Sequence, residues 1–284
     1  VVAIAIALWS FMTAISGLVQ NYLQLLLARI GVGVGEAGGS PPAHSMISDI
    51  FPPERRASAL AFYSMGINFG ILFGFLAGGW LNEFFDWRVA FFVVGAPGIV
   101  VALFVRYTLR EPIRGLIEDR QDNATDTPFP KVLKLLWSRL SFRHLAIGGA
   151  LNAFAGYSSS NWTASFMIRS HDMSTGELGT WLALIMGVGG AIGVFWGSYI
   201  AERLAKFNVR WYMWMPTITG MICVPFMIAT YVVEGAYTAL IVSIVPGILF
   251  NVYLGNSLAM THALVGLRMR AVASAVLFFL INLI

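Results

Sequence analysis

The stretch 22–48 reads YLQLLLARIGVGVGEAGGSPPAHSMIS, and it carries Arg29 and Glu36 inside an apolar segment long enough to cross a bilayer. A formal charge at the centre of a membrane helix costs about 2.5–3.5 kcal/mol on insertion scales, so such residues persist where they face the protein interior or a wet cavity. The two are seven positions apart, so on a helix they project from one face about 10.5 Å apart along the axis. The stretch therefore indicates a functional site within a membrane helix.

Glycine and proline surround this pair. They are Gly31, Gly33, Gly35, Gly38, Gly39, Pro41 and Pro42. Glycine lets a neighbouring membrane helix approach closely, and the prolines free two carbonyls that neighbours or cavity water must then satisfy. We therefore expect a kinked helix beside a cavity. Residues 33–38 also match the nucleotide pattern GxGxxG, but that pattern needs a preceding strand, so we discard it.

The composition indicates an all-α integral membrane protein. The chain has 284 residues, of which 58% are hydrophobic and only 11% are charged, whereas soluble domains carry about 25% charged residues. The single cysteine, Cys223, gives no disulfide framework. The sequence shows no Cys/His ligand pattern and no paired carboxylates, so we expect no enzyme, no catalytic residues, no metal and no cofactor. The chain begins and ends inside apolar runs, so we expect it to be part of a longer protein.

Nine apolar segments of membrane length follow one another along the chain. They are 1–19, 22–48, 57–81, 88–108, 143–168, 178–201, 211–232, 236–260 and 270–284. The loops on one side hold all of the 18 Lys and Arg residues except Arg29, Arg88 and Arg169. By the positive-inside rule that side is cytoplasmic. The basic charge therefore reports topology, and we expect no nucleic-acid partner.

The longest connection divides the chain into a bundle at 1–108, a cytoplasmic linker at 109–142 and a second bundle at 143–284. Residues 131–140 of the linker predict an amphipathic helix at the membrane surface, with Trp137 at headgroup level. Residues 56–59, RASA, resemble 270–275, RAVASA, at the entry to a later segment. Repeated halves are typical of secondary transporters, which bind their cargo near the midplane between the halves.

Small and polar residues at membrane depth give the remaining candidates. The segment 57–81 contains a ladder of glycines at 66, 70, 74 and 78, followed by Gly79. We favour tight helix packing there over contact with a substrate. Two polar clusters can either line a cavity or join helices by hydrogen bonds. Their candidate substrate-binding residues are Asn152, Tyr157, Asn161, Asn251, Tyr253 and Asn256. Asn68 is interpreted as structural, and His44 as solvated or bonded to the backbone.

These residues together resemble the major facilitator superfamily, and within it the bacterial Spinster-like (Spns) transporters. Residues 29–37, RIGVGVGEA, are similar to the fourth-helix pattern RxxQGxGxA, with Val32 in place of glutamine. Residues 197–206, GSYIAERLAK, resemble the cytoplasmic signature GxxxDRxxR, with Glu202 in place of aspartate. The glycine ladder resembles the fifth-helix antiporter motif but lacks its Gly-Pro step. The Spinster-like assignment rests on 35–37 (GEA), 41–45 (PPAHS) and 51–56 (FPPERR).

The resemblance implies a fold of two pseudo-symmetric helical bundles, incomplete here because the nine segments correspond to helices 3 to 11. It also implies a proton-coupled transporter that moves a lysophospholipid or sphingolipid-like molecule by alternating access. Arg29 and Glu36 match that family's intramembrane coupling pair, and the family's first-helix aspartate is not in this sequence. Protonation of Glu36 would bias the conformational equilibrium, which is what coupling requires. The alternative is a static ion pair that fixes helix packing.

The expected partners are therefore an amphipathic lipid, protons and membrane lipids. Its headgroup would lie near Arg29, because a guanidinium suits an anion. Glu202 and Arg203 would latch the cytoplasmic ends of helices. We expect a monomer in a bacterial inner membrane. The competing transporter hypothesis is a carrier of sugar acids, other organic anions or drugs, and a non-transporting scaffold would tolerate loss of both Arg29 and Glu36.

Overall fold

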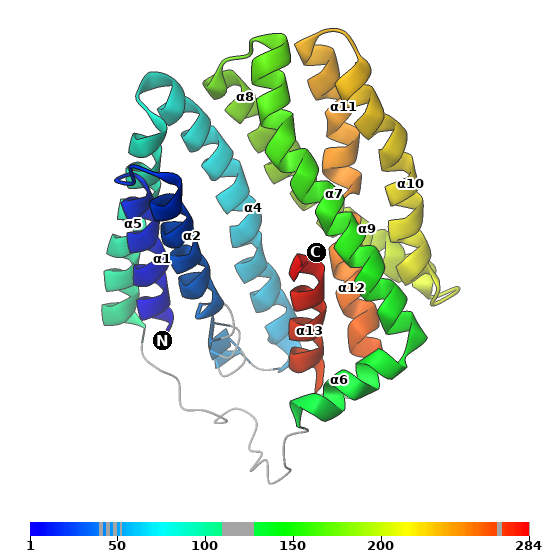
Figure 1. Ribbon diagram of the computed structural model, residues 1–284. Helices are drawn as coiled ribbons and strands as arrows, with labels where there is room; N and C mark the ends of the chain where they lie inside the picture. The colour runs from blue at the N-terminus through cyan, green and yellow to red at the C-terminus, as the bar shows by residue number, and fades with distance from the viewer. Residues whose placement is uncertain are drawn as a thin grey trace. The chain divides into compact units, whose positions relative to one another are not determined.

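The computed structural model describes residues 1–39, 42–43, 46–47, 50–51, 53–109, 128–265 and 269–283, and every regular element among them is a helix (Figure 1). The predicted all-α class is thereby confirmed. The chain divides into two compact units. The first is Val1–Asp122 with Ser174–Ala183, and the second is Asn123–Met173 with Leu184–Ile284.

The first unit is built on α1, which packs against both α2 and α5. Its helices are α1 (Val2–Ser16), α2 (Tyr22–Ala37), α4 (Pro53–Phe84), α5 (Trp87–Thr108) and α8 (Thr175–Leu182). Side-chain caps begin several of them, since Asn21 accepts a hydrogen bond from the Gln24 amide and Asp86 accepts one from the Trp87 amide. Such caps satisfy backbone donors that the first helical turn leaves free.

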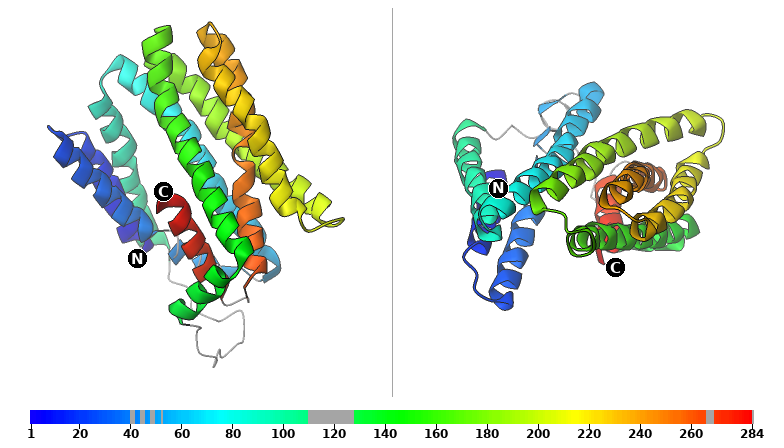
Figure 2. Two further views of the ribbon diagram at one scale, coloured as in Figure 1. Left: turned by 45° about the vertical axis from the view of Figure 1, so that its right-hand side comes forward. Right: turned by 90° about the horizontal axis from the view of Figure 1, so that it is seen from above.

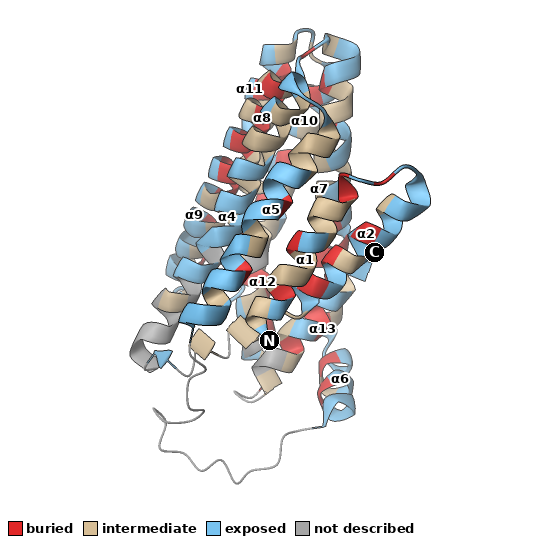
Figure 3. Ribbon diagram, turned by 90° about the vertical axis from the view of Figure 1, so that its left-hand side faces the viewer, coloured by how far each residue is buried: buried red, intermediate tan, exposed pale blue. Residues whose placement is uncertain are grey.

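Glycine allows the close approach of α1 and α5. A Cβ at Gly95 would lie 2.6 Å from the backbone nitrogen of Ala14, so only glycine fits this position. Along α4, by contrast, none of the described side chains is buried, and Figure 3 shows mostly exposed and half-buried positions there. The first unit therefore combines a tightly packed pair of helices with one helix that is widely accessible.

The second unit holds the remaining helices. They are α6 (Phe129–Ser138), α7 (Leu140–His171), α9 (Gly189–Ala205), α10 (Trp211–Val232), α11 (Ala236–Leu249), α12 (Val252–Ala263) and α13 (Arg270–Leu283). Figure 2 shows α9 to α12 running beside one another, in agreement with their contacts. An apolar core joins α6, α7 and α13, and its fully buried members include Leu136, Phe142 and Leu277.

The predicted membrane segments each coincide with one or more helices, with two differences. In the segment expected at 22–48, α2 ends at Ala37, where Gly38 and Gly39 follow and lower helix propensity, and the described residues 42–43 and 46–47 are helical again. The segment expected at 236–260 is two helices, because α11 ends at Leu249 and α12 begins at Val252. Pro246 lies one turn before this break, and it lacks the N–H that would bond the preceding turn.

The boundary between the two units falls within the helical stretch Thr175–Ala205. Thr175–Ala205 is continuous, but its middle turn, η1 (Ala183–Val188), is a π-helix. The division between the units falls after Ala183, at the start of this turn. A π-helical turn widens the hydrogen-bond ring locally and occurs mostly as a single turn inside α-helices. Ser174–Ala183 groups with the first unit because α8 packs on α4. The division expected from the sequence, into 1–108, 109–142 and 143–284, stays a prediction.

Candidate functional site

One face of α2 is locked onto α1. A Cβ at Gly31 would lie 2.8 Å from the Met12 side chain, and one at Gly35 would lie 2.7 Å from the Trp9 backbone nitrogen. Ala28 is 4% exposed and lies on the same face. Because this face is packed without spare room, the rotation of α2 about its axis is set, and with it the direction of every other side chain on the helix.

Arg29 and Glu36 each follow a packed residue of that face by one position, and both side chains are exposed. The Arg29 guanidinium carbon lies 6.0 Å from the centre of the Phe91 ring of α5, at the outer limit of a cation–π contact. No salt bridge joins Arg29 to Glu36 in the described part of the chain. An ion pair is formed elsewhere in the first unit, between Arg88 and Asp86 at 3.8 Å. The static ion pair, which was the alternative to a coupling role, is therefore not formed in this structure.

This arrangement has a clear chemical capacity. An accessible carboxylate can take up and release a proton, and an accessible guanidinium can bind an anionic group through several N–H donors. Both stand on a helix whose position is determined by close packing against α1. The coupling role of the two residues stays a prediction.

A second polar group lies in the second unit, on the helices α7, α12 and α13. The Tyr157 hydroxyl donates a hydrogen bond to Asn282 Oδ1 at 3.0 Å. Asn152 lies on α7 and Tyr253 on α12. The Asn152 amide nitrogen is buried and has no hydrogen-bond partner among the described residues. An unpaired buried donor costs about 1–3 kcal/mol, so this amide is available to a ligand at small further cost.

Asn282 had no role in the sequence analysis, although the structure joins it to Tyr157. The only signal was a single amide in the otherwise apolar run at 275–284. Its own side-chain nitrogen donates to the carbonyl of Phe278, so its oxygen is left to accept from Tyr157. A lone amide at membrane depth is therefore worth noting even at the end of a chain.

The other candidate amides donate to the carbonyl four residues earlier in their own helices. Asn161 bonds to Tyr157, Asn251 to Gly247 and Asn256 to Val252. Asn161 is exposed and Asn251 is half-buried, whereas Asn256 is only 1% exposed. The first two can therefore reach a ligand more readily than the third. Their predicted role in binding is not decided by these bonds.

Glu202 and Arg203 lie exposed at the end of α9, where Arg203 is 4.6 Å from the centre of the Tyr199 ring. A cation in the last turn also interacts favourably with the helix dipole. The latch role stays a prediction. Asn68 is half-buried on α4, and His44 lies outside the described residues.

The end of α4 is fastened to α8, a contact that the sequence analysis did not anticipate. The Cα of Gly179 would lie 2.9 Å from a Cβ at Gly79, and the reverse distance is the same. The Trp80 indole N–H donates to Thr180 Oγ1 at 3.0 Å, and the Gly176 amide donates to Glu83 Oε2 at 2.5 Å. By the sidedness of the loops, this fastening lies at the non-cytoplasmic end of both helices.

Comparison with known proteins places the whole chain in one family. Residues 1–284 match the profile of the Major Facilitator Superfamily. The "MFS-type efflux pump" of Mycolicibacterium smegmatis is 32% identical over 284 residues, which cover 98% of this chain and 64% of that protein. "Protein spinster homolog 1" of Rattus norvegicus is 30% identical over 222 residues, which cover 72% of this chain and 42% of that protein.

Solved structures agree with these relatives. Crystal structures of a bacterial homologue of the human lysosomal transporter Spinster, one inward-facing and occupied and one inward-facing and unoccupied, are both 32% identical to this chain. Their TM-scores are 0.81 and 0.84, with 100% and 99% of this chain covered. The match covers 64% of the length of each of those proteins. The predicted fold of this family is thus confirmed for the part of it that the chain spans.

Proposed function

The chain belongs to the Major Facilitator Superfamily, and from that premise we propose that it moves an amphipathic lipid across a membrane by alternating access, coupled to protons. The observation that carries the proposal is the accessible acid and base, Glu36 and Arg29, on a helix locked against α1. The likeness to Spinster proteins supports a lipid of the lysophospholipid or sphingolipid class. An integral membrane protein follows from the family and from the long apolar helices, and the bacterial relatives favour an inner membrane.

Coupling requires that the proton interact differently with the two conformations. Arg29 and Glu36 lie within reach of ligand or solvent and are not bonded to each other. A conformational change that brings Arg29 toward Glu36 in one state would favour the ionised carboxylate there, and separation would favour protonation. A proton gradient would then drive the equilibrium in one direction.

The cargo would bind with its headgroup near Arg29. Guanidinium groups recognise phosphate by paired N–H donors, which a neutral headgroup cannot match. The acyl chain would need an apolar wall, and α4 offers accessible apolar side chains such as Phe69 and Phe73. Transport of lipids with anionic headgroups should therefore exceed transport of otherwise identical neutral lipids, and equal rates would contradict this placement.

The coupling is tested by Glu36→Gln in the full-length transporter, reconstituted in vesicles. We expect folded protein whose uptake of a lysophospholipid no longer responds to a pH gradient, and whose spin-label distances no longer change with pH. Glu234→Gln is the matched control, because Glu234 is an exposed carboxylate between α10 and α11. An unchanged pH response of the Glu36→Gln protein would reject the coupling role.

A second candidate is a carrier of drugs, sugar acids or other organic anions. It is favoured by the relative named "MFS-type efflux pump", whose 32% identity extends over 98% of this chain. The same vesicles separate the two candidates when lysolipids, sugar acids and cationic dyes are offered in parallel. Transport of a dye or sugar acid without any lysolipid uptake would favour this second function.

A further inference from the structure

Helix α6 has two apolar faces, and one of them packs against the described residues of its own unit. Val132 and Leu136 are fully buried in the core shared with α7 and α13. On another side, Phe129, Leu133 and Trp137 recur at four-residue spacing and are 56%, 38% and 49% exposed. Residues four apart lie on one face of a helix, so these three form a continuous apolar stripe. The ten residues of α6 therefore have apolar side chains on a face that the second unit does not cover.

The surroundings of this stripe are strongly cationic. Residues 128–144 contain Lys131, Lys134, Arg139 and Arg143 and no acidic residue. Lys131 and Lys134 are exposed, and neither has a carboxylate partner within the described part of the chain. The helix precedes α7 on the side that the positive-inside rule identifies as cytoplasmic. The leaflet on that side carries anionic lipids, which attract lysines near the surface.

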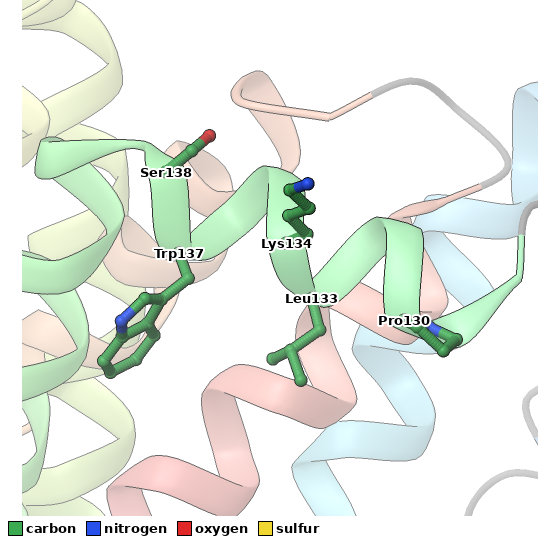
Figure 4. A pocket seen from close by; sticks show the side chains of 5 residues that line it. All are labelled: Pro130, Leu133, Lys134, Trp137 and Ser138. Carbon is green, nitrogen blue, oxygen red and sulfur yellow. The ribbon is translucent and has the colours of Figure 1, made fainter.

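A groove lies where the apolar stripe meets the lysines. It is shallow and open, and it is lined by Pro130, Leu133, Lys134, Trp137 and Ser138 of α6. Figure 4 shows Leu133 and Trp137 pointing to one side of the helix, and Lys134 and Ser138 pointing to the other. The Ser138 hydroxyl already donates to the carbonyl of Leu135, so it can offer a ligand only its lone pairs. Lys134 is therefore the cationic group of the groove.

We propose that this groove binds an anionic phospholipid of the cytoplasmic leaflet, as a fixed part of the protein's surroundings and separate from any cargo. The phosphate pairs with the Lys134 ammonium, and Lys131 adds attraction one turn away. The glycerol and upper acyl chain lie against Leu133 and the Trp137 ring, since an indole at this depth suits the boundary between headgroups and acyl chains. The bound lipid thereby covers the face that the protein leaves open and ties the linker helix to the membrane.

The proposal is tested with the full-length protein in nanodiscs that contain phosphatidylcholine with phosphatidylglycerol. Native mass spectrometry counts the phosphatidylglycerol molecules that remain bound after release from the disc. We expect Lys134→Gln to weaken the tightest phosphatidylglycerol site about fivefold, which corresponds to about 1 kcal/mol, the typical contribution of one lysine near an anionic surface. Lys206→Gln is the matched control, because Lys206 is an exposed lysine on the same side of the membrane, at the end of α9.

Two further variants sharpen the result. Trp137→Ala should weaken the same site, whereas a substitution of the exposed Phe207, which lies outside the groove, should not. The proposal is overturned if Lys134→Gln and Lys206→Gln lose the same amount of lipid, if neither loses any, or if phosphatidylcholine is retained as well as phosphatidylglycerol. Because the readout is the retained bilayer lipid, it is independent of whether the protein transports lysolipids.

Discussion

Two helices, α9 and α4, carry glycine at every fourth position. The glycines of α9 are closely packed, whereas those of α4 have no described atom beside them. On α9, a Cβ at Gly189 would lie 3.3 Å from Ile248, one at Gly193 would overlap the Ile248 carbonyl, and one at Gly197 would lie 2.7 Å from Val252. On α4, a Cβ at each glycine from Gly66 to Gly78 at four-residue spacing would meet no described atom within 4 Å. The first ladder is a packing surface and the second is open.

The sequence interpretation favoured tight packing for the α4 ladder, whereas no described atom lies within 4 Å of a Cβ at Gly66, Gly70, Gly74 or Gly78. The pattern shows that one helix face is lined by small residues, but it does not show which residues pack against that face. Helices α11 and α12 pack against the glycine face of α9. The glycine face of α4 is left accessible as far as Gly78, and α8 closes on the helix only at Gly79. The open part is therefore a candidate surface for cargo, the alternative that the sequence analysis had left second.

The largest effect is expected from Gly193→Ala on the packed ladder. The new methyl group would overlap the carbonyl oxygen of Ile248, and this backbone atom cannot rotate away. Overpacking of this kind costs about 1–3 kcal/mol. Thermal unfolding of the full-length protein in detergent measures the loss. The control is Gly74→Ala on the open ladder, which should be neutral or slightly stabilising because alanine favours the helix by up to about 1 kcal/mol.

Equal stability of these two variants would mean that the packed and open ladders do not differ in solution. A destabilised Gly74→Ala protein would mean that α4 has a neighbour in the membrane that these contacts do not include. Either result would remove the basis for treating α4 as a cargo surface.

Much of this fold follows from the sequence because hydropathy is additive along a segment. The predicted segments at 88–108 and 211–232 differ by one residue or none from α5 and α10. The break between α11 and α12 was missed because Pro246 resembles the prolines that α10 accommodates at Pro216 and Pro225 without ending. Whether a proline breaks a membrane helix depends on its neighbours, which local sequence does not contain.

The candidate site was predictable in part, for a different reason. A charge in an apolar run is costly wherever it lies, so Arg29 and Glu36 could be singled out without coordinates. Tyr157 could be singled out as polar, but its partner Asn282 is 125 positions away, and only folding brings the two together. Glu83 was missed because it lies near a helix end, where a carboxylate needs no explanation, and its bond to the Gly176 amide is visible only in the structure.

An intermediate effect is expected from Gly79→Ala, where the open ladder ends. Its methyl group would meet the backbone of α8 at Thr175 and Gly179, at 2.6 and 2.9 Å, so α4 and α8 must separate. The bonds of Trp80 to Thr180 and of Glu83 to Gly176 would lengthen with them. We expect faster amide hydrogen exchange in Thr175–Leu182 and a loss of about 1–2 kcal/mol in stability, at the lower part of the range for overpacking.

The neighbouring residue supplies the control for this experiment. Gly78→Ala adds the same methyl group one position earlier, where no described atom lies within 4 Å. Its exchange rates over α8 should match those of the unchanged protein. If Gly78→Ala and Gly79→Ala give the same exchange rates over α8, the close glycine crossing at Gly79 does not hold the α4–α8 contact.

The smallest effect on stability, and the sharpest test of the open ladder, is expected from Gly74→Leu. A Cβ at Gly74 would meet no described atom within 4 Å, so we expect the unfolding temperature to change little, as is usual for substitutions away from packed features. If cargo lies along this face, the same side chain would occupy its space and raise the KM for lysolipid uptake several-fold. Gly220→Leu on α10 is the matched control, because Gly220 is also open and lies outside the ladder.

A change in KM for Gly74→Leu alone would show that the two glycine ladders serve different purposes, one joining helices and the other leaving room for a ligand. Equal KM values for both variants would leave α4 as a lipid-facing helix, because open space at a glycine is common to both a cargo surface and a bilayer surface.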